Sequence, residues 1–97
     1  MRETEILGFK AKVAHTFRER ARGLIGTRSL AANEGLLIER CNAIHTCFMS
    51  FPIDVHFLDR GGREVKVVRN VRPWRLFVWG GWRAASVLET AVASERA

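Results

Sequence analysis

The fold is decided by the stretch Ile44-His45-Thr46-Cys47-Phe48-Met49-Ser50-Phe51-Pro52-Ile53-Asp54-Val55-His56-Phe57-Leu58-Asp59. Its second half alternates, which places Ile53, Val55 and Phe57 on one face of a strand and the residues between them on the other. Pro52 interrupts the run, so we predict two strands, residues 42–49 and 53–58, that bend apart there. If these strands pair as a hairpin, their polar side chains lie close together.

The flanking sequence has short alternating segments separated by turns. Strands are predicted near residues 7–13, 36–38, 63–71 and 86–92, with a hairpin turn at 59–62. Thr16 and Glu19 form a capping box, which predicts a short helix that runs to about Ile25 and ends at Gly26. The tail from Ala84 also fits a helix, but a strand to about Val92 is preferred. We therefore expect one domain over residues 1–97, mainly β, as a small β-sandwich or open barrel with one short α-helix near the N-terminus.

Composition limits the class of protein. The chain has 97 residues, a net charge of +6 and no run of 18 apolar residues, so no membrane-spanning helix is expected. The charged N-terminus lacks the apolar region of a signal peptide, which favours a cytoplasmic location. Cys41 and Cys47 on one strand would be roughly 20 Å apart, too far for a disulfide, so we expect free thiols. The spacing of cysteines and histidines matches no zinc motif, and we expect neither a metal nor a cofactor.

An ordered set of short motifs resembles the family called domain of unknown function 192. These motifs are Arg22-Gly23-Leu24-Ile25-Gly26, Glu34-Gly35-Leu36-Leu37, Ile44-His45-Thr46 with Met49, Pro52-Ile53-Asp54-Val55 with Phe57-Leu58-Asp59, and Val87-Leu88-Glu89. Together they cover roughly residues 5–92. The resemblance implies a mainly β, sandwich-like domain and no established activity, substrate or cofactor.

A ligand pocket is expected from five residues of these motifs, namely Arg22, His45, Met49, Asp54 and Glu89. A histidine paired with a carboxylate can act as a general base, and an arginine can hold an anionic ligand. The alternative is a buried polar network that fixes the bend at Pro52. The residues favour the buried network over catalysis, because a histidine–carboxylate pair without an identifiable nucleophile is weak evidence for an enzyme.

A second candidate is the segment from Arg69 to Arg83, which contains all three tryptophans. Its expected interaction surface comprises Arg72, Trp74, Arg75, Trp79 and Trp82. Basic and aromatic residues in alternation can bind nucleic acid, a membrane interface or a second copy of the chain. They can also complete a small core, although a loop this short cannot bury all three tryptophans. We predict an exposed aromatic patch.

The sequence favours a non-enzymatic binding or accessory module. Its partner would be a small anionic ligand, another protein or its own copy. An enzyme with a polar site at His45, Asp54 and Arg22 is the first alternative, and nucleic-acid binding through residues 69–83 is the second.

Overall fold

The computed structural model describes residues 2–93, which form eight strands and one helix. The elements are β1 (Glu3–Ile6), β2 (Phe9–Ala14), α1 (Phe17–Arg22), β3 (Glu34–Glu39), β4 (Ala43–Ile44), β5 (Ile53–Leu58), β6 (Glu64–Val71), β7 (Val78–Trp79) and β8 (Ser86–Ala91). The mainly β fold class with one short helix near the N-terminus is confirmed.

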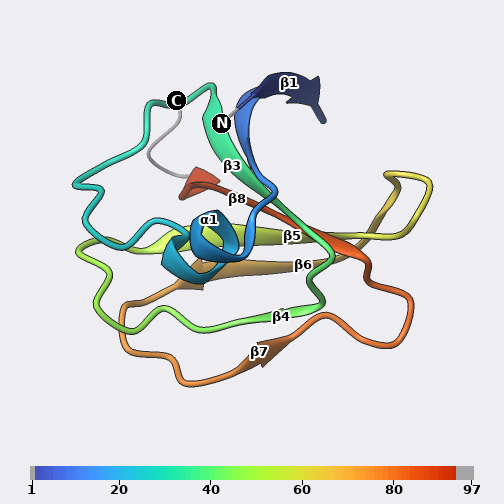
Figure 1. The fold of residues 1–97 in the computed structure, drawn as a ribbon. Helices are drawn as coiled ribbons and strands as arrows, with labels where there is room; N and C mark the ends of the chain where they lie inside the picture. The colour runs from blue at the N-terminus through green and yellow to red at the C-terminus, as the bar shows by residue number, and fades with distance from the viewer. Residues whose placement is uncertain (1, 94–97) are drawn as a thin grey trace.

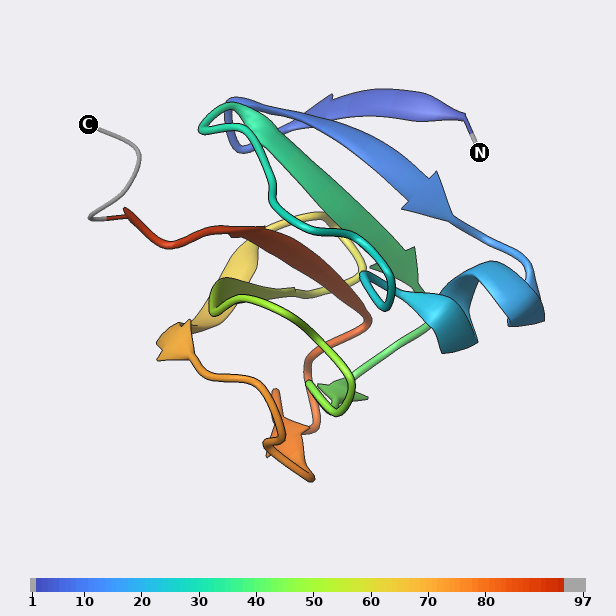
Figure 2. The same ribbon diagram turned by 90° about the vertical axis from the view of Figure 1, so that its left-hand side faces the viewer.

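Six strands make one curled sheet in the order β1-β2-β3-β8-β5-β6, and β4 pairs with β7 in a separate sheet (Figure 1). Strand β8 is central, with β3 on one side and β5 on the other, both antiparallel to it. Strands β2 and β3 are parallel, and helix α1 lies in the connection between them. Figure 2 shows the β4–β7 pair below the main sheet and well away from β1.

The two faces of the main sheet carry separate apolar clusters. Ile53, Val55 and Phe57 of β5 lie in the larger cluster, where Leu24 and Met49 pack against the same face. Leu58 and Leu88 belong to the smaller cluster on the other face. The predicted alternation along β5 is confirmed, because side chains one residue apart point to opposite faces.

Helix α1 begins as predicted and ends earlier. Thr16 accepts a hydrogen bond from the Glu19 N–H (3.1 Å), and the Glu19 carboxylate accepts one from the Thr16 N–H (3.0 Å), which completes the capping box. The predicted end near Ile25 is wrong. Gly23 has a φ of 52°, and this left-handed backbone ends the helix after Arg22.

The predicted strand over residues 42–49 is also wrong, as is its pairing with residues 53–58. Only Ala43 and Ile44 are extended there, and they pair with β7, whereas β5 pairs with β6 and β8. The chain leaves the strand after Ile44 because Thr46 is buried against the loop before β7.

Smaller differences concern the ends of the sheet. The strand predicted near residues 7–13 corresponds to β2, which begins only at Phe9 because Leu7 and Gly8, with φ of 52° and 84°, make a tight turn. Strand β1, before that turn, was not predicted. The predicted C-terminal strand is confirmed as β8, and Cys41 and Cys47 are free and half-buried. Within residues 2–93, no helix is long and apolar enough to cross a membrane.

Candidate pocket and interaction surface

Glu89 is a buried carboxyl at the centre of the sheet. It pairs with Leu36 of β3 and Val55 of β5, so its side chain enters the larger apolar face. The residue is 3% exposed, and its Oε1 has no hydrogen-bond partner. Burial raises the pKa of the Glu89 carboxyl to about 8, because the apolar surroundings disfavour the charged form. At neutral pH the carboxyl therefore carries its proton.

The Glu89 side chain lines a cavity of about 180 Å³, called here the Glu89 cavity. The walls come from α1, the loop that follows it, β3 and residues 41–49. The lining residues are Arg20, Ala21, Arg22, Gly23, Leu24, Ile25, Ile38, Cys41, Ala43, Ile44, His45, Met49 and Glu89. Four of the five residues of the expected ligand pocket, Arg22, His45, Met49 and Glu89, thus line one cavity.

The polar groups around the Glu89 cavity are mainly hydrogen-bond donors. Arg20 Nε is buried without a partner. His45 Nδ1 accepts the Cys47 N–H (3.2 Å), so a neutral ring carries its proton on Nε2. Burial raises the pKa of the Cys41 thiol, and the nearby Glu89 adds to this effect, while a backbone hydrogen bond of Ala43 and the charge of Arg20 oppose it. The thiol therefore stays protonated and donates to the Ala43 carbonyl (3.0 Å).

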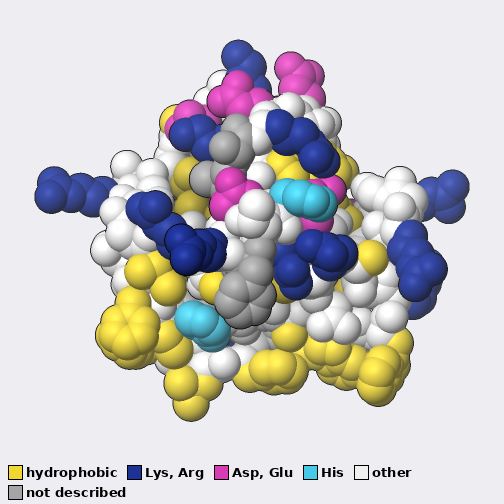
Figure 3. Space-filling view, in the orientation of Figure 1, with side chains coloured by type: hydrophobic (Ala, Val, Ile, Leu, Met, Phe, Trp, Pro, Cys, Tyr) yellow, Lys and Arg dark blue, Asp and Glu magenta, His cyan; other side chains and the backbone are white. Residues whose placement is uncertain are grey.

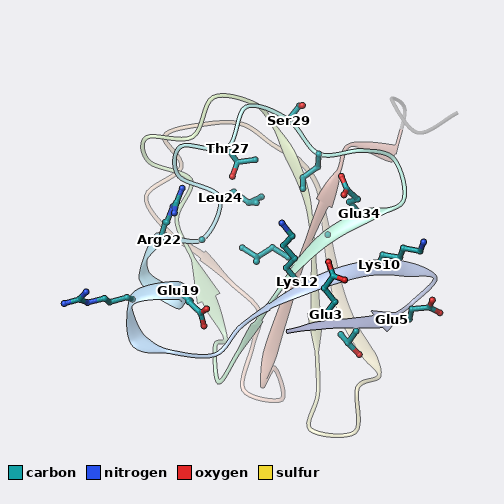
Figure 4. Close-up of a pocket in the computed structure, with 16 residues that line it drawn as sticks. Glu3, Glu5, Lys10, Lys12, Glu19, Arg22, Leu24, Thr27, Ser29 and Glu34 are labelled. Atoms are coloured by element: carbon teal, nitrogen blue, oxygen red, sulfur yellow. The ribbon is translucent and has the colours of Figure 1, made fainter. Parts of the chain in front are cut away.

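A wider groove of about 930 Å³ adjoins the cavity and shares Arg22, Gly23 and Leu24 with it. Figure 4 shows Lys12 and Glu3 near the middle of this groove, between β2 and the loop after α1. Its charged residues are of both signs, so the groove has no preference for one sign of ligand charge.

Asp54, the fifth residue of the expected pocket, lies elsewhere. It pairs with Thr90 of β8, one position beyond Glu89, and therefore points to the opposite face of the sheet. Its carboxylate accepts hydrogen bonds from Arg69 (2.9 Å) and from the N–H groups of Asn70 and Ala93 (2.9 Å each). Burial alone raises the pKa of Asp54, but these three bonds together lower it below its usual value. Asp54 ties β5 to β6 and to the end of β8.

Six large apolar side chains are exposed on the loops around the β4–β7 pair. This set, called here the aromatic rim, consists of Phe48, Trp74, Leu76, Phe77, Trp79 and Trp82. Trp82 is 89% exposed and Leu76 is 80% exposed. Figure 3 shows hydrophobic side chains gathered along the edge of the molecule where β4 and β7 lie. The predicted exposure of the aromatic patch is confirmed.

The rim side chains pack in pairs. The rings of Phe48 and Trp74 have centroids 4.7 Å apart, and those of Trp79 and Trp82 are 5.2 Å apart in an edge-to-face arrangement. Phe48, from the other loop, was not in the sequence-based set. Phe48 was missed because the sequence placed it within a predicted strand. The structure has no strand there, and Phe48 has a φ of 67°.

Thr46 joins the two loops of the rim and is fully buried. Its hydroxyl donates to the Arg72 carbonyl (2.5 Å) and accepts the Arg75 N–H (2.9 Å). Its backbone N–H donates to the Arg75 carbonyl, and its carbonyl accepts the Trp74 N–H (2.9 Å each). Four hydrogen bonds at one residue hold the rim in a defined conformation.

The chain around the rim contains no acidic residue. Neither residues 40–53 nor residues 65–88 include an Asp or Glu, whereas the second segment has five cations. These cations are Lys66, Arg69, Arg72, Arg75 and Arg83. In Figure 3 the acidic side chains in view lie on the half of the molecule away from the rim.

Comparison with known proteins gives the family. The model of DUF192, described as Uncharacterized ACR, COG1430, matches residues 1–94. The chain belongs to the DUF192 family. A UPF0127 protein from Thermococcus sibiricus (strain DSM 12597 / MM 739) is 42% identical over an alignment of 89 residues, and the match covers 86% of this chain and 55% of the relative. This DUF192 chain thus spans about half the length of that relative.

Two solved structures share the fold. A protein of unknown function from Novosphingobium aromaticivorans DSM 12444 has a TM-score of 0.81 and 22% identity, over 89% of this chain and 65% of its own. A Sinorhizobium meliloti 1021 protein, provisionally described as a transcription regulator, has a TM-score of 0.81 and 21% identity, over 89% and 70%. At these identities the likeness concerns the fold alone.

A histidine relay lies among the described residues of this DUF192 chain, and the sequence reasoning missed it. His56 Nδ1 lies 2.6 Å from a Glu64 carboxylate oxygen, and Nε2 lies 3.1 Å from the Thr90 hydroxyl. The order of groups resembles a nucleophile, base and orienting acid, but Thr90 is fully buried, so the relay serves as a structural network. In the β5–β6 hairpin Glu64 pairs with Leu58, which is two positions from His56 on the same strand. The contact therefore follows from the register of this hairpin. Within residues 2–93, no three His, Cys, Asp or Glu side chains are grouped to hold a metal ion.

Proposed function

We propose that this DUF192 chain is a non-enzymatic binding module that attaches to anionic lipid surfaces through the aromatic rim. The observation that carries the proposal is the exposure of six large apolar side chains on one edge of a small domain. Contiguous exposed apolar patches are rare on soluble domains unless they bind something. Trp82 and Leu76 are the most exposed of the six, as expected of side chains that enter the boundary between headgroups and acyl chains.

The charge around the rim supports an anionic partner. Arg72 and Arg75 flank Trp74, Arg83 follows Trp82, and no carboxylate is near them in sequence. Each cation near an anionic membrane contributes about 1 kcal/mol, and this attraction weakens with salt. A location in the cytoplasm, expected from the sequence, would bring the rim to the anionic leaflet of the membrane.

Nucleic acid is the alternative partner, because it is negatively charged like an anionic membrane. The description of the S. meliloti relative favours it. Bases bind by stacking on open aromatic faces. Here the rim rings pack against one another in pairs, and Leu76, between the two pairs in sequence, has no ring to offer. An aliphatic tip among aromatic side chains suits hydrocarbon better than nucleobases.

The test is co-sedimentation with vesicles of phosphatidylcholine alone and of phosphatidylcholine mixed with phosphatidylglycerol. We expect binding to the mixed vesicles only, with affinity that falls as salt is added. Trp82→Ala should weaken binding about fivefold, the equivalent of about 1 kcal/mol of lost apolar contact. Leu7→Ala, which removes an exposed leucine from the β1–β2 turn, is the matched control and should bind as the parent does.

Three outcomes would overturn the proposal. The first is the absence of binding to mixed vesicles at low salt. The second is equal loss of binding in Leu7→Ala and Trp82→Ala. The third is tight binding of single-stranded oligonucleotide, or concentration-dependent dimerisation, in place of vesicle binding; either would assign the rim to a different partner.

A further inference from the structure

The Glu89 cavity is separate from the rim and has the features of a ligand site. Two of its polar atoms, Glu89 Oε1 and Arg20 Nε, are buried and have no hydrogen-bond partner. An unpaired buried polar atom costs about 1–3 kcal/mol, and two of them on one cavity wall would be satisfied together by one bound molecule. Ala21, Arg22 and His45 in the lining are exposed, so the cavity reaches the surface.

The chemistry of the lining selects the ligand. Arg20 Nε and a neutral His45 offer N–H donors, and Arg22 adds a second guanidinium. A carboxylic acid kept neutral by its apolar site donates a hydrogen bond as well. Hydrogen-bond donors and two guanidinium groups favour a ligand that accepts hydrogen bonds and carries negative charge. They disfavour an amine or a metal cation as the ligand.

The size of the Glu89 cavity and the apolar part of its lining narrow the class of ligand further. The volume of about 180 Å³ equals roughly six water molecules, well below the space that drug-sized ligands fill. Leu24, Ile38, Ile44 and Met49 form the apolar wall. The ligand must therefore combine a small charged head with a short apolar body.

We propose that the Glu89 cavity binds a small monocarboxylate, whose oxygens take hydrogen bonds from Arg20 and Glu89 and whose apolar body lies against Met49 and Ile38. The site does not depend on the rim or on the partner proposed for it. It makes the chain a binder of small organic acids in addition to its surface role.

The site predicts that affinity depends on the proton of Glu89. The titratable and charged groups that face this carboxyl are Arg20 and Arg22 from α1, and Cys41 and His45 from residues 41–49. The neighbours of Glu89 on β3 and β5 are apolar. None of the four adds negative charge at neutral pH, since the Cys41 thiol is protonated. Because Glu89 loses its proton near pH 8, carboxylate affinity should be about tenfold weaker at about pH 9 than at about pH 7.

Isothermal titration with isovalerate and benzoate as probes tests the proposal, with isovaleramide and isopentylamine as uncharged and cationic counterparts. We expect the two carboxylates to bind and the counterparts not to bind. Glu89→Gln keeps an N–H donor but cannot ionise, so it should retain binding at about pH 7 and lose the tenfold decline at about pH 9. Glu5→Gln, an exposed acid on β1, is the matched control and should keep that decline.

A second variant locates the site. Ala43→Leu adds bulk to the cavity wall and should abolish carboxylate binding. Binding of neither carboxylate, binding of the amine in their place, an unchanged pH dependence in Glu89→Gln, or full binding by Ala43→Leu would each overturn the proposal. Failure of vesicle binding alone would refute the rim and leave this site standing.

Discussion

Replacing Glu89 with glutamine should stabilise the protein, by an amount that grows with pH. The folded-state pKa is about 8 and the ordinary value is 4.5, a difference of about 3.5 units (8 minus 4.5). Between these two values the folded state holds a proton that the unfolded state has released. The free energy of unfolding therefore falls as pH rises through this window, by about 1.4 kcal/mol per unit.

The parent protein should lose about 3 kcal/mol by about pH 7 and about 4 kcal/mol by about pH 8, relative to its stability below the unfolded-state pKa. Glu89→Gln has the shape of the protonated acid and no such loss. The two proteins should have similar stability at about pH 5, and at about pH 7 the variant should melt about 10–20 °C higher.

Denaturant unfolding of both proteins at several pH values from about 5 to 9 measures the difference. The acids with lowered pKa values, such as Asp54, affect stability only at lower pH, so they cancel in the comparison. A difference between parent and variant that stays constant to within about 0.5 kcal/mol across this range would refute the reasoning, because it would mean that Glu89 titrates normally.

Three further substitutions test the packing and polar contacts. Asp54→Asn should cost about 1–3 kcal/mol of stability at neutral pH, because it removes the charge that three donors bind. This cost should shrink as pH falls below 3.8, since a carboxyl with a lowered pKa stabilises the fold only while it is ionised. Urea unfolding at acid and at neutral pH measures the difference. Thr46→Val should cost about 1–3 kcal/mol, because the Arg72 carbonyl and the Arg75 N–H lose their hydrogen bonds to the buried hydroxyl. It should also increase amide hydrogen exchange in both rim loops, and unchanged exchange would contradict the role given to this residue. Gly80→Ala should cost about 1–3 kcal/mol, because the new Cβ would lie 2.2 Å from the ring of Phe57, while Gly61→Ala, whose Cβ meets nothing closer than 3.4 Å, should melt close to the parent.

The sequence predicted the elements whose causes are local. The capping box depends on two residues three positions apart, and the alternation of β5 follows from the geometry of one strand. The exposure of the tryptophans was predictable because a short loop next to Gly80 and Gly81 has little interior.

The errors concern contacts between distant segments. Residues 45–49 have the composition of a strand, but Thr46 finds four backbone partners in residues 72–75, which no local pattern reveals. Asp54 and Glu89 were expected in one pocket. Because Val55 pairs with Glu89, the side chains of Asp54 and Glu89 point to opposite faces of the sheet. A register shifted by one residue would have placed both on the same face.

The central place of β8 has a consequence for how the chain is made. The strands of the main sheet that precede it form two groups, β1 to β3 and β5 with β6, and only β8 connects them. The ribosome must therefore release the chain as far as β8 before either group gains its inner neighbour, and until then both present open edges. A nascent chain halted before Ser86 should be prone to self-association, and the six-stranded sheet should form only as β8 emerges.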